Sequence, residues 1–285
     1  MMLSKFEYFK PNSLEEVFEL LDTQEGDYAL LAGGTDLFVD MKHKTRKPDY
    51  IIDVKGIDEF NKIEDRDDEV FIGGTITCNE IIDSELMNEN FKVLVDAASE
   101  VAAHQVRNRA TVVGNLCTTS PGADMFPPLL VLNTKVIVES KEGSREIPLD
   151  QFATGVKQNA LQDKEVVKGL LVKKHAADGR GAYIKKRRTK GPDLSAVGVA
   201  GFLSEEEGYL AFALGAVAPT PIYLDVSDTF FSDGSFEEKQ SEILDTILEN
   251  INPIDDVRST KEYREKMSQV YARRILSRLW EAGDK

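Results

Sequence analysis

Two glycine turns, each next to a strand-like segment, constrain the fold of this chain more than any other feature of its sequence. The first, at residues 33–34, follows the apolar run 28–32 and precedes a helix expected from Asp36. The second, at Gly114, closes a strand expected over 111–115. Glycine lets consecutive backbone N–H groups approach phosphate oxygens, and a helix N-terminus adds positive potential. The two turns together predict a diphosphate cradle, while the alternative, that each glycine only permits a positive φ, stays open.

The spacing of these glycines excludes the two commonest phosphate-binding loops. Neither turn has the Rossmann pattern G-x-G-x-x-G, and neither has the P-loop pattern G-x-x-x-x-G-K-S/T. A diphosphate must therefore be held by another arrangement. A third glycine pair, Gly73 and Gly74, is interpreted as a turn without a ligand.

Apolar spacing predicts a mixed α/β pattern, in which helices and strands alternate first and strands dominate after the helix that ends near Leu132. Helices are expected over 13–23, from 36, within 90–108, over 127–132 and from 259, and strands over 28–32, 50–54, 70–72, 111–115, 135–140, 145–148 and three stretches within 182–217. The polar stretch 228–238 is expected to be an exposed connection. A boundary between two domains is expected near 173–181.

Composition excludes several classes of function. The net charge of −15 argues against binding to nucleic acid, which requires a basic surface. Two cysteines are too few for a four-thiolate zinc site or an iron–sulfur cluster, and the three histidines lack the spacing of metal ligands. No apolar run approaches the roughly 20 residues that span a bilayer, and no secretory signal is visible. A cytoplasmic protein without its own metal site is expected.

Two basic runs, 42–47 and 185–190, interrupt the acidic background. A solvated surface is the favoured interpretation of the first run, while a surface and a functional role are equally open for the second. Cys117 lies beside the second glycine turn, and it is expected to be a small apolar residue rather than a redox group.

The full strings around both turns resemble the FAD-binding medium subunits of molybdenum hydroxylases, the family of xanthine dehydrogenase and carbon monoxide dehydrogenase. LLAGGTDL at 30–37 is similar to the first FAD loop of that family. QVRNRATVVGN at 105–115, followed by SPGAD at 120–124, is similar to its second FAD region, although Val113 replaces a usual glycine. The likeness continues over nearly the whole chain, in order, through the strings YIKKRR at 183–188, GAVAPTP at 215–221 and RSTKEYR at 258–264.

The resemblance implies a set of FAD-binding residues. Backbone groups of the first loop would cradle the diphosphate from one side, and the second region would hold it from the other. The implied residues are Leu30, Leu31, Ala32, Gly33, Gly34, Thr35, Asp36 and Leu37, then Ala110, Thr111, Gly114 and Asn115, then Thr118 and Asp124 for ribityl and adenosine-side hydroxyls, Lys185 near the flavin or its phosphates, and Val101 and Val167 as apolar lining. No acid–base catalytic residue is expected, because the isoalloxazine supplies the redox chemistry.

The resemblance also implies an architecture and a role. The fold would be α+β. An FAD-binding region of two lobes, of the vanillyl-alcohol-oxidase or PCMH type, would cover 1–175, and a domain like the C-terminal domain of CO dehydrogenase flavoproteins would cover 176–285. The flavin would take electrons from 2Fe–2S clusters on a small subunit, which draw them from a molybdopterin site on a large subunit, and pass them to NAD⁺ or another acceptor. A purine such as xanthine is the expected substrate. The alternatives are a stand-alone FAD reductase of the enolpyruvyl-UDP-glucosamine reductase type and a scaffold subunit without FAD.

Overall fold

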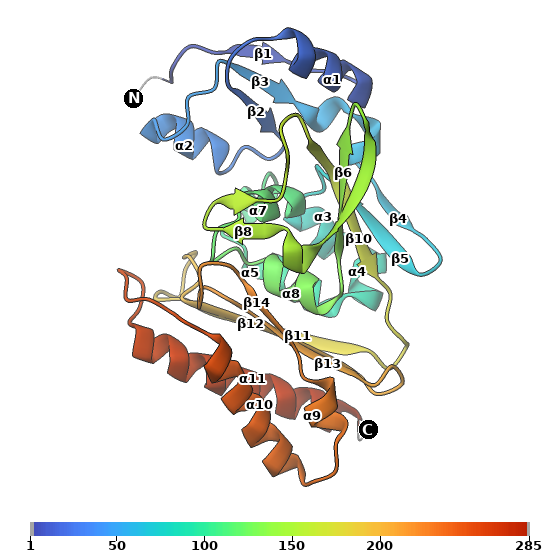
Figure 1. Cartoon of the computed structure of the whole chain (residues 1–285), viewed down its shortest axis with the longest axis vertical. Coiled ribbons are helices and arrows are strands. Elements are labelled where there is room, and N and C mark those ends of the chain that lie inside the picture. Colours follow the sequence, from blue (N-terminus) through green and yellow to red (C-terminus); the bar gives the residue numbers. More distant parts are fainter. Residues whose placement is uncertain (1–2, 284–285) are drawn as a thin grey trace.

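The computed structural model describes residues 3–283, which form an elongated stack of two lobes and a further domain. An N-terminal lobe lies at one end, a middle lobe follows it, and a C-terminal domain lies at the other end (Figure 1). The two lobes and the C-terminal domain each contain both helices and strands. The α+β class expected from the sequence is therefore confirmed.

The N-terminal lobe is a small parallel sheet between two helices. In spatial order its strands are β1 (Glu7–Phe9), β3 (Tyr50–Asp53) and β2 (Tyr28–Leu31). Helix α1 (Leu14–Thr23) begins after its cap Ser13 and packs its apolar stripe on one face of the sheet. Helix α2 (Leu37–His43) packs on the other face through Met41. The helices and strands expected for this lobe are present.

The middle lobe is an antiparallel sheet with helices packed against it. In spatial order its strands are β4 (Ile63–Asp65), β5 (Glu69–Gly73), β10 (Val166–Lys173), β6 (Lys135–Ser140) and β7 (Gly143–Pro148). Its helices are α3 (Cys78–Asp83), α4 (Glu85–Asn90), α5 (Lys92–Glu100), α6 (His104–Arg107), α7 (Val112–Cys117) and α8 (Phe126–Val131). A two-stranded ribbon, β8 (Ala153–Gly155) with β9 (Gln158–Asn159), and the short 3₁₀ turns Val54–Gly56, Asp58–Phe60 and Leu149–Gln151 complete these two lobes.

The C-terminal domain is an antiparallel sheet of four strands in chain order, with the domain's own helices on one side. The strands are β11 (Arg180–Lys186), β12 (Val197–Ser204), β13 (Tyr209–Gly215) and β14 (Ile222–Asp225). The helices are α9 (Ser227–Phe231), α10 (Phe236–Asn250) and α11 (Lys261–Gly283).

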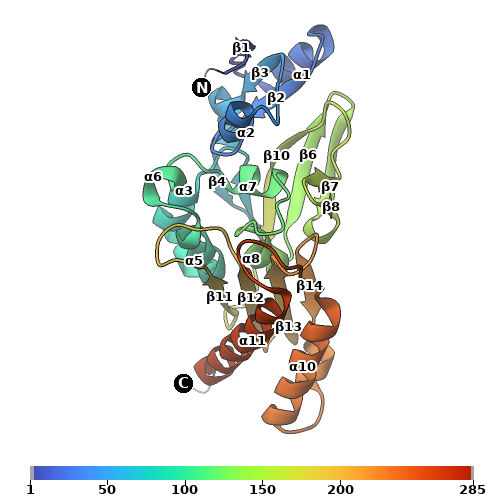
Figure 2. The same cartoon turned by 90° about the vertical axis from the view of Figure 1, so that its left-hand side faces the viewer.

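Helices cover both faces of this C-terminal sheet. Helices α10 and α11 lie on one face, and α5 and α8 of the middle lobe lie on the other (Figure 2). The residues of β12 alternate accordingly, since Val199 and Leu203 join the core with α11 whereas Ala200 and Phe202 join the core of the middle lobe. Every residue of β12 and β13 is buried as a result. The C-terminal sheet thus shares a continuous core with the middle lobe.

Two expectations about local structure are wrong. Residues 111–115 do not form a strand, because Thr111 caps helix α7 and makes only an isolated bridge to Thr77. The stretch 228–238 is not a simple exposed connection, because it contains most of α9 and the start of α10. Phe230 in α9 is buried against Trp280, with 5.6 Å between ring centroids. The cap in the first case and this distant partner in the second outweigh local propensity.

Helix α11 forms where the sequence predicts it, but its buried face differs in the first turn. The recurrence of an apolar residue every four positions predicts a buried face made of Tyr263, Met267, Tyr271, Ile275 and Leu279. The hydroxyl Oγ1 of Thr260 accepts the N–H of Tyr263, so Thr260 caps the helix, one residue later than the expected start at Ser259. Tyr263 is 41% exposed, whereas Arg264 and Ser268 are buried. The apolar stripe is continuous only from Tyr271 onward.

The connection between β10 and β11 contains a buried histidine. The ring of His175 stacks on Tyr209 at 5.3 Å between centroids, and its Nδ1 lies 3.0 Å from Oε2 of Glu207. Although partial burial of the carboxyl opposes it, hydrogen bonds from Lys173, the Ala176 N–H and His175 lower the pKa of Glu207 to about 2. This carboxylate ties the connection to the β12–β13 turn.

We expect Glu207→Gln to flatten the acid limb of the stability profile. An unfolded glutamate has a pKa of about 4.3, so the stabilisation from Glu207 is fully present above that pH and is lost as pH falls toward 2. Urea unfolding at pH 7 and pH 3 should show a smaller loss for Glu207→Gln than for the wild type. Glu206→Gln, one residue away and exposed, is the control, and equal losses in all three proteins would contradict the expectation.

Candidate functional site

The first glycine turn leaves the end of β2 and packs directly on the segment that carries the second turn. Gly34 adopts a φ of +76°, a left-handed conformation that favours glycine. Gly33 does not, but a Cβ on Gly33 would overlap the carbonyl oxygen of Arg109 and lie 3.2 Å from the nitrogen of Thr111. Gly33 is therefore required because two backbones meet there, and the fold brings the two turns together.

The second turn is the start of helix α7 rather than a loop. Oγ1 of Thr111 accepts the Gly114 N–H at 3.0 Å, and a Cβ on Gly114 would lie 2.5 Å from that oxygen. Gly114 thus leaves room for the helix cap and has no positive φ. Val113, where the family string has glycine, lies inside the helix, and this departure costs no backbone strain.

The first turn has unused hydrogen-bond donors. Within residues 3–283, no acceptor bonds to the N–H groups of Gly33, Gly34, Thr35 or Asp36. Four consecutive free N–H groups between a strand and a helix form the donor set that phosphate oxygens require. The residues present therefore fit the diphosphate of FAD.

A cleft of about 590 Å³ opens between the N-terminal and middle lobes beside these turns, which is a usual size for a ligand site. Four of the expected ligand residues line it, namely Leu30, Ala32, Gly114 and Val167. Tyr28 and the segment 159–166, to which no sequence motif pointed, form further walls. Arg46 and Lys47 were expected on a solvated surface, whereas both line the cleft. These residues carry no common motif, and only the fold collects them.

An ion pair holds one wall of the cleft in place. Arg145 donates from Nε and Nη2 to the two carboxylate oxygens of Glu165, each at 2.7 Å, and Nη2 also donates to the carbonyl of Ala160. The N–H of Gln162 donates to the same carboxylate at 2.7 Å. The hydrogen bonds from Arg145, more than its charge, keep the pKa of Glu165 below its usual range.

Cys117 lines the cleft without being reactive. Burial raises the pKa of its thiol to about 12, so the group stays protonated at neutral pH. Its carbonyl accepts a hydrogen bond from Nδ2 of Asn159. The expectation that Cys117 acts as a small apolar residue agrees with this setting.

Three other expected ligand residues gather where the middle lobe meets the C-terminal domain. Nζ of Lys185 donates to Oδ2 of Asp124 at 2.7 Å and to the carbonyl of Glu100 at 3.1 Å, next to Val101. The hydroxyl of Tyr183 donates to Oδ1 of Asp124 at 3.0 Å. Burial raises the pKa of Asp124, and Lys185 opposes that rise. The side chain of Lys185 is only 1% exposed, so the alternative of a surface lysine is wrong.

Helix α7 connects the two groups of residues. Oδ1 of Asn115 accepts the N–H of Met125, the neighbour of Asp124, at 3.1 Å. Thr118 donates from Oγ1 to the Asn115 carbonyl at 2.7 Å. Leu31, Leu37 and Ala110 pack in apolar clusters of the two lobes, whereas Asp36 is exposed.

The described chain offers no metal site or membrane span. Between residues 3 and 283, no group of His, Cys, Asp and Glu side chains is arranged to hold a metal ion. Over the same residues, no helix is long and apolar enough to cross a membrane.

Two family models match the chain. Residues 4–172 match the family described as the FAD binding domain in molybdopterin dehydrogenase, which is more than half of the chain. Residues 182–279 match the family described as the CO dehydrogenase flavoprotein C-terminal domain.

Individual relatives agree with these matches. The carbon monoxide dehydrogenase medium chain of Hydrogenophaga pseudoflava is 28% identical and covers 98% of this chain and 99% of its own length. The xanthine dehydrogenase FAD-binding subunit of Escherichia coli O157:H7 is 27% identical, with coverage of 95% and 94%. A solved structure of the Hydrogenophaga pseudoflava carbon monoxide dehydrogenase superposes with a TM-score of 0.91 at 29% identity, over 99% of both chains. The chain belongs to the family of FAD-binding subunits of molybdopterin dehydrogenases, the molybdenum hydroxylases.

Proposed function

We propose that this chain binds one FAD in the cleft between its lobes and relays electrons within a molybdenum hydroxylase complex. A small subunit would deliver them from 2Fe–2S clusters, a large subunit would carry molybdopterin, and NAD⁺ or another acceptor would receive them. The observation that carries the proposal is the meeting of two glycine turns beside the cleft. Ala32 and Gly114 form part of the cleft wall, and the four N–H groups of residues 33–36, directly after Ala32, have no acceptor among the described residues.

The residues of the chain would divide the binding of FAD between them. The N–H groups of 33–36 would hold the diphosphate, and the helix start at Thr111 would approach it from the other lobe. Asp124 and Lys185 would place a fixed pair of charges at the junction with the C-terminal domain. The FAD supplies the redox chemistry, while the protein binds, orients and excludes water.

The substrate that we propose for the whole complex is a purine. The xanthine dehydrogenase FAD-binding subunit and the caffeine dehydrogenase subunit beta of Pseudomonas sp. are 27% and 26% identical to this chain, and both named substrates are purines. The carbon monoxide and nicotinate enzymes are relatives of similar identity, at 28% and 31%. An assay of the copurified complex with xanthine, carbon monoxide and nicotinate separates these substrates. Activity with carbon monoxide or nicotinate but not with xanthine would contradict the proposal of a purine substrate.

We further propose a division into an FAD-binding domain over 1–175 and a second domain over 176–285, in a cytoplasmic complex. The end of β10 at Lys173 and the start of β11 at Arg180 support this division. A stand-alone reductase of the enolpyruvyl-UDP-glucosamine reductase type would leave the match over 182–279 without an explanation. A scaffold subunit without FAD would purify without flavin absorbance.

We expect about one FAD per chain, bound without a covalent bond. Among residues 3–283, no histidine lines the cleft, and burial raises the pKa of the Cys117 thiol there to about 12. Acid precipitation should release all the flavin into the supernatant. Flavin that stays on the pellet would contradict non-covalent binding, and a protein that purifies and reconstitutes without flavin would overturn the proposed function.

A further inference from the structure

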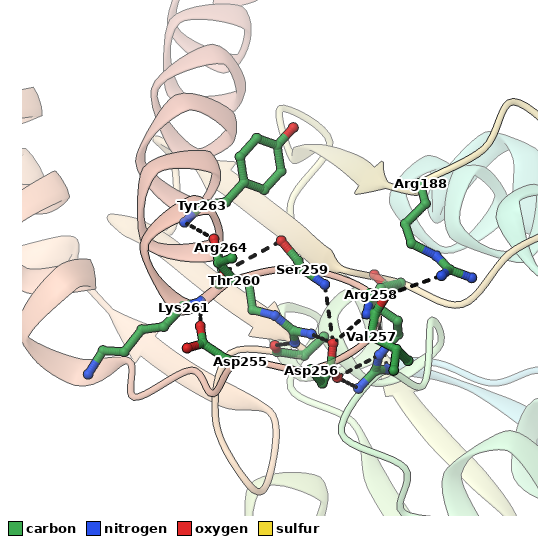
Figure 3. A network of polar contacts seen from close by, with 12 residues as sticks. Arg188, Asp255, Asp256, Val257, Arg258, Ser259, Thr260, Lys261, Tyr263 and Arg264 are labelled. Carbon is green, nitrogen blue, oxygen red and sulfur yellow. Dashed lines mark hydrogen bonds and ion pairs between the residues drawn. The ribbon is translucent and has the colours of Figure 1, made fainter.

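The string RSTKEYR at 258–264 places a charged side chain in the core. Arg264, in the first turn of α11, is 2% exposed and is among the largest fully buried side chains of residues 3–283. Figure 3 shows it pointing from the helix toward the loop that precedes α11. The FAD cleft does not include this residue, so the cleft does not account for it.

Arg264 holds two segments with one guanidinium group. Nη1 donates to the carbonyl of Ala216 at 2.5 Å, and Nη2 donates to Oδ1 of Asp256 at 2.6 Å. Asp256 in turn accepts four more hydrogen bonds, from the N–H groups of Arg258 and Ser259 and from Nε and Nη2 of Arg258 (Figure 3). Although burial opposes it, these bonds hold the pKa of Asp256 well below its usual range. The carboxylate therefore stays charged.

Ala216 connects Arg264 to the segment that contains Asp124. Its carbonyl is held by Arg264, and its own N–H donates to the carbonyl of Pro121 at 2.5 Å. Ala216 has a φ of 65°, which is unfavourable for alanine and persists only where surrounding contacts impose it. Pro121 lies three residues before Asp124, and Asp124 pairs with Lys185. An unbroken set of contacts thus joins Arg264 to that pair.

We propose that Arg264 and Asp256 are positioning residues for the flavin site, because they fix Ala216 and through it the 120–124 segment that presents Asp124 to Lys185. This inference rests on the proposed function in one respect, namely that Asp124 and Lys185 contact the FAD.

The energetics favour positioning over plain stabilisation. Burying an arginine and an aspartate removes both charges from water, and apolar side chains of similar volume often stabilise a fold equally well. Here, Nε of Arg264 is buried with no hydrogen-bond partner among the described residues, which adds to the cost. What a guanidinium adds is a rigid fork that fixes two acceptors in direction as well as distance.

The test compares Arg264→Met with Arg273→Met, which removes an exposed arginine from the same helix. Arg264→Met should weaken FAD binding by about tenfold or more, which corresponds to about 1.4 kcal/mol or more. It should also speed hydrogen exchange in peptides covering 118–126 of the apoprotein and shift the flavin reduction potential. Arg273→Met should leave all three unchanged. Arg264→Lys keeps the charge but loses the fork, so FAD binding should stay weak.

Should Arg264→Met fail to fold, Asp256→Asn decides the question, because it keeps the side-chain shape and removes only the charge. Unchanged FAD affinity, potential and exchange at 118–126 in a folded variant would overturn the inference. Faster exchange spread evenly over 182–283, without enrichment at 118–126, would also overturn it. A wild-type protein that binds no FAD would instead refute the proposed function. The exchange measurement would still test whether Arg264 and Asp256 fix the 120–124 segment.

Discussion

Gly33→Val is expected to abolish FAD binding and to destabilise the protein. A Cβ at position 33 would overlap the carbonyl oxygen of Arg109, so even Gly33→Ala must separate the backbones of two lobes at the cleft. Overpacking of this kind typically costs about 1–3 kcal/mol. A branched side chain also shields the free N–H groups of the first turn. Fluorescence titration with FAD and thermal unfolding of the apoprotein measure the two effects separately.

Gly191→Val is the matched control for this experiment. A Cβ on Gly191 would meet nothing within 4 Å, and this residue has no positive φ. FAD affinity and thermal stability should therefore equal those of the wild type. If soluble Gly33→Val protein contains as much FAD as the wild type, then the first turn is only structural and the diphosphate lies elsewhere.

Lys185→Met is expected to lower the free energy of unfolding by about 3–5 kcal/mol, because it leaves a buried carboxylate without its cation. Lys185 is 1% exposed and lies 2.7 Å from Asp124, whose pKa burial already raises. If the pair contacts the flavin as we propose, loss of the cation should also lower the flavin reduction potential or weaken FAD retention. Urea unfolding and redox titration of the purified protein measure these changes.

The second mutation Asp124→Asn separates the two roles of Lys185. In Lys185→Met/Asp124→Asn the stranded charge is gone, so most of the stability should return while FAD retention stays impaired. Lys190→Met, in the same basic run but exposed, should change neither quantity. High salt should leave the effect of Lys185→Met intact, because a buried pair is poorly screened. If Lys185→Met alone has the same free energy of unfolding as the wild type, the pair of Lys185 and Asp124 contributes nothing to stability.

Much of the fold is predictable because local patterns and tertiary packing agree. Ser13 caps α1 where the S-x-x-E pattern predicts a helix start, and the β6–β7 hairpin forms around Gly143. The three strands within 182–217 appear as β11 to β13. In α1 and β6 the side-chain period identifies the buried face, whereas β12 and β13 are buried on both faces. The families of both domains are likewise recognisable from short strings.

Other local predictions fail because distant residues decide them. The β-branched pair Val112 and Val113 favours a strand, yet the Thr111 cap and the middle-lobe core place it in α7. The polar stretch around α9 is ordered by Trp280, about fifty residues further along the chain. Sequence windows of ten or so residues contain no information about such partners.

The sequence by itself determined the fold class, the family and the two glycine turns, because these depend on residue type and short-range spacing. Only the tertiary structure decided what each residue does there. It showed that Gly33 faces Arg109 rather than adopting a positive φ, and that Lys185 is buried against Asp124. It also placed Arg264 in the core. The physical reason is that backbone contact, desolvation and charge pairing are properties of segments that meet in space, and the chain order does not specify which segments meet.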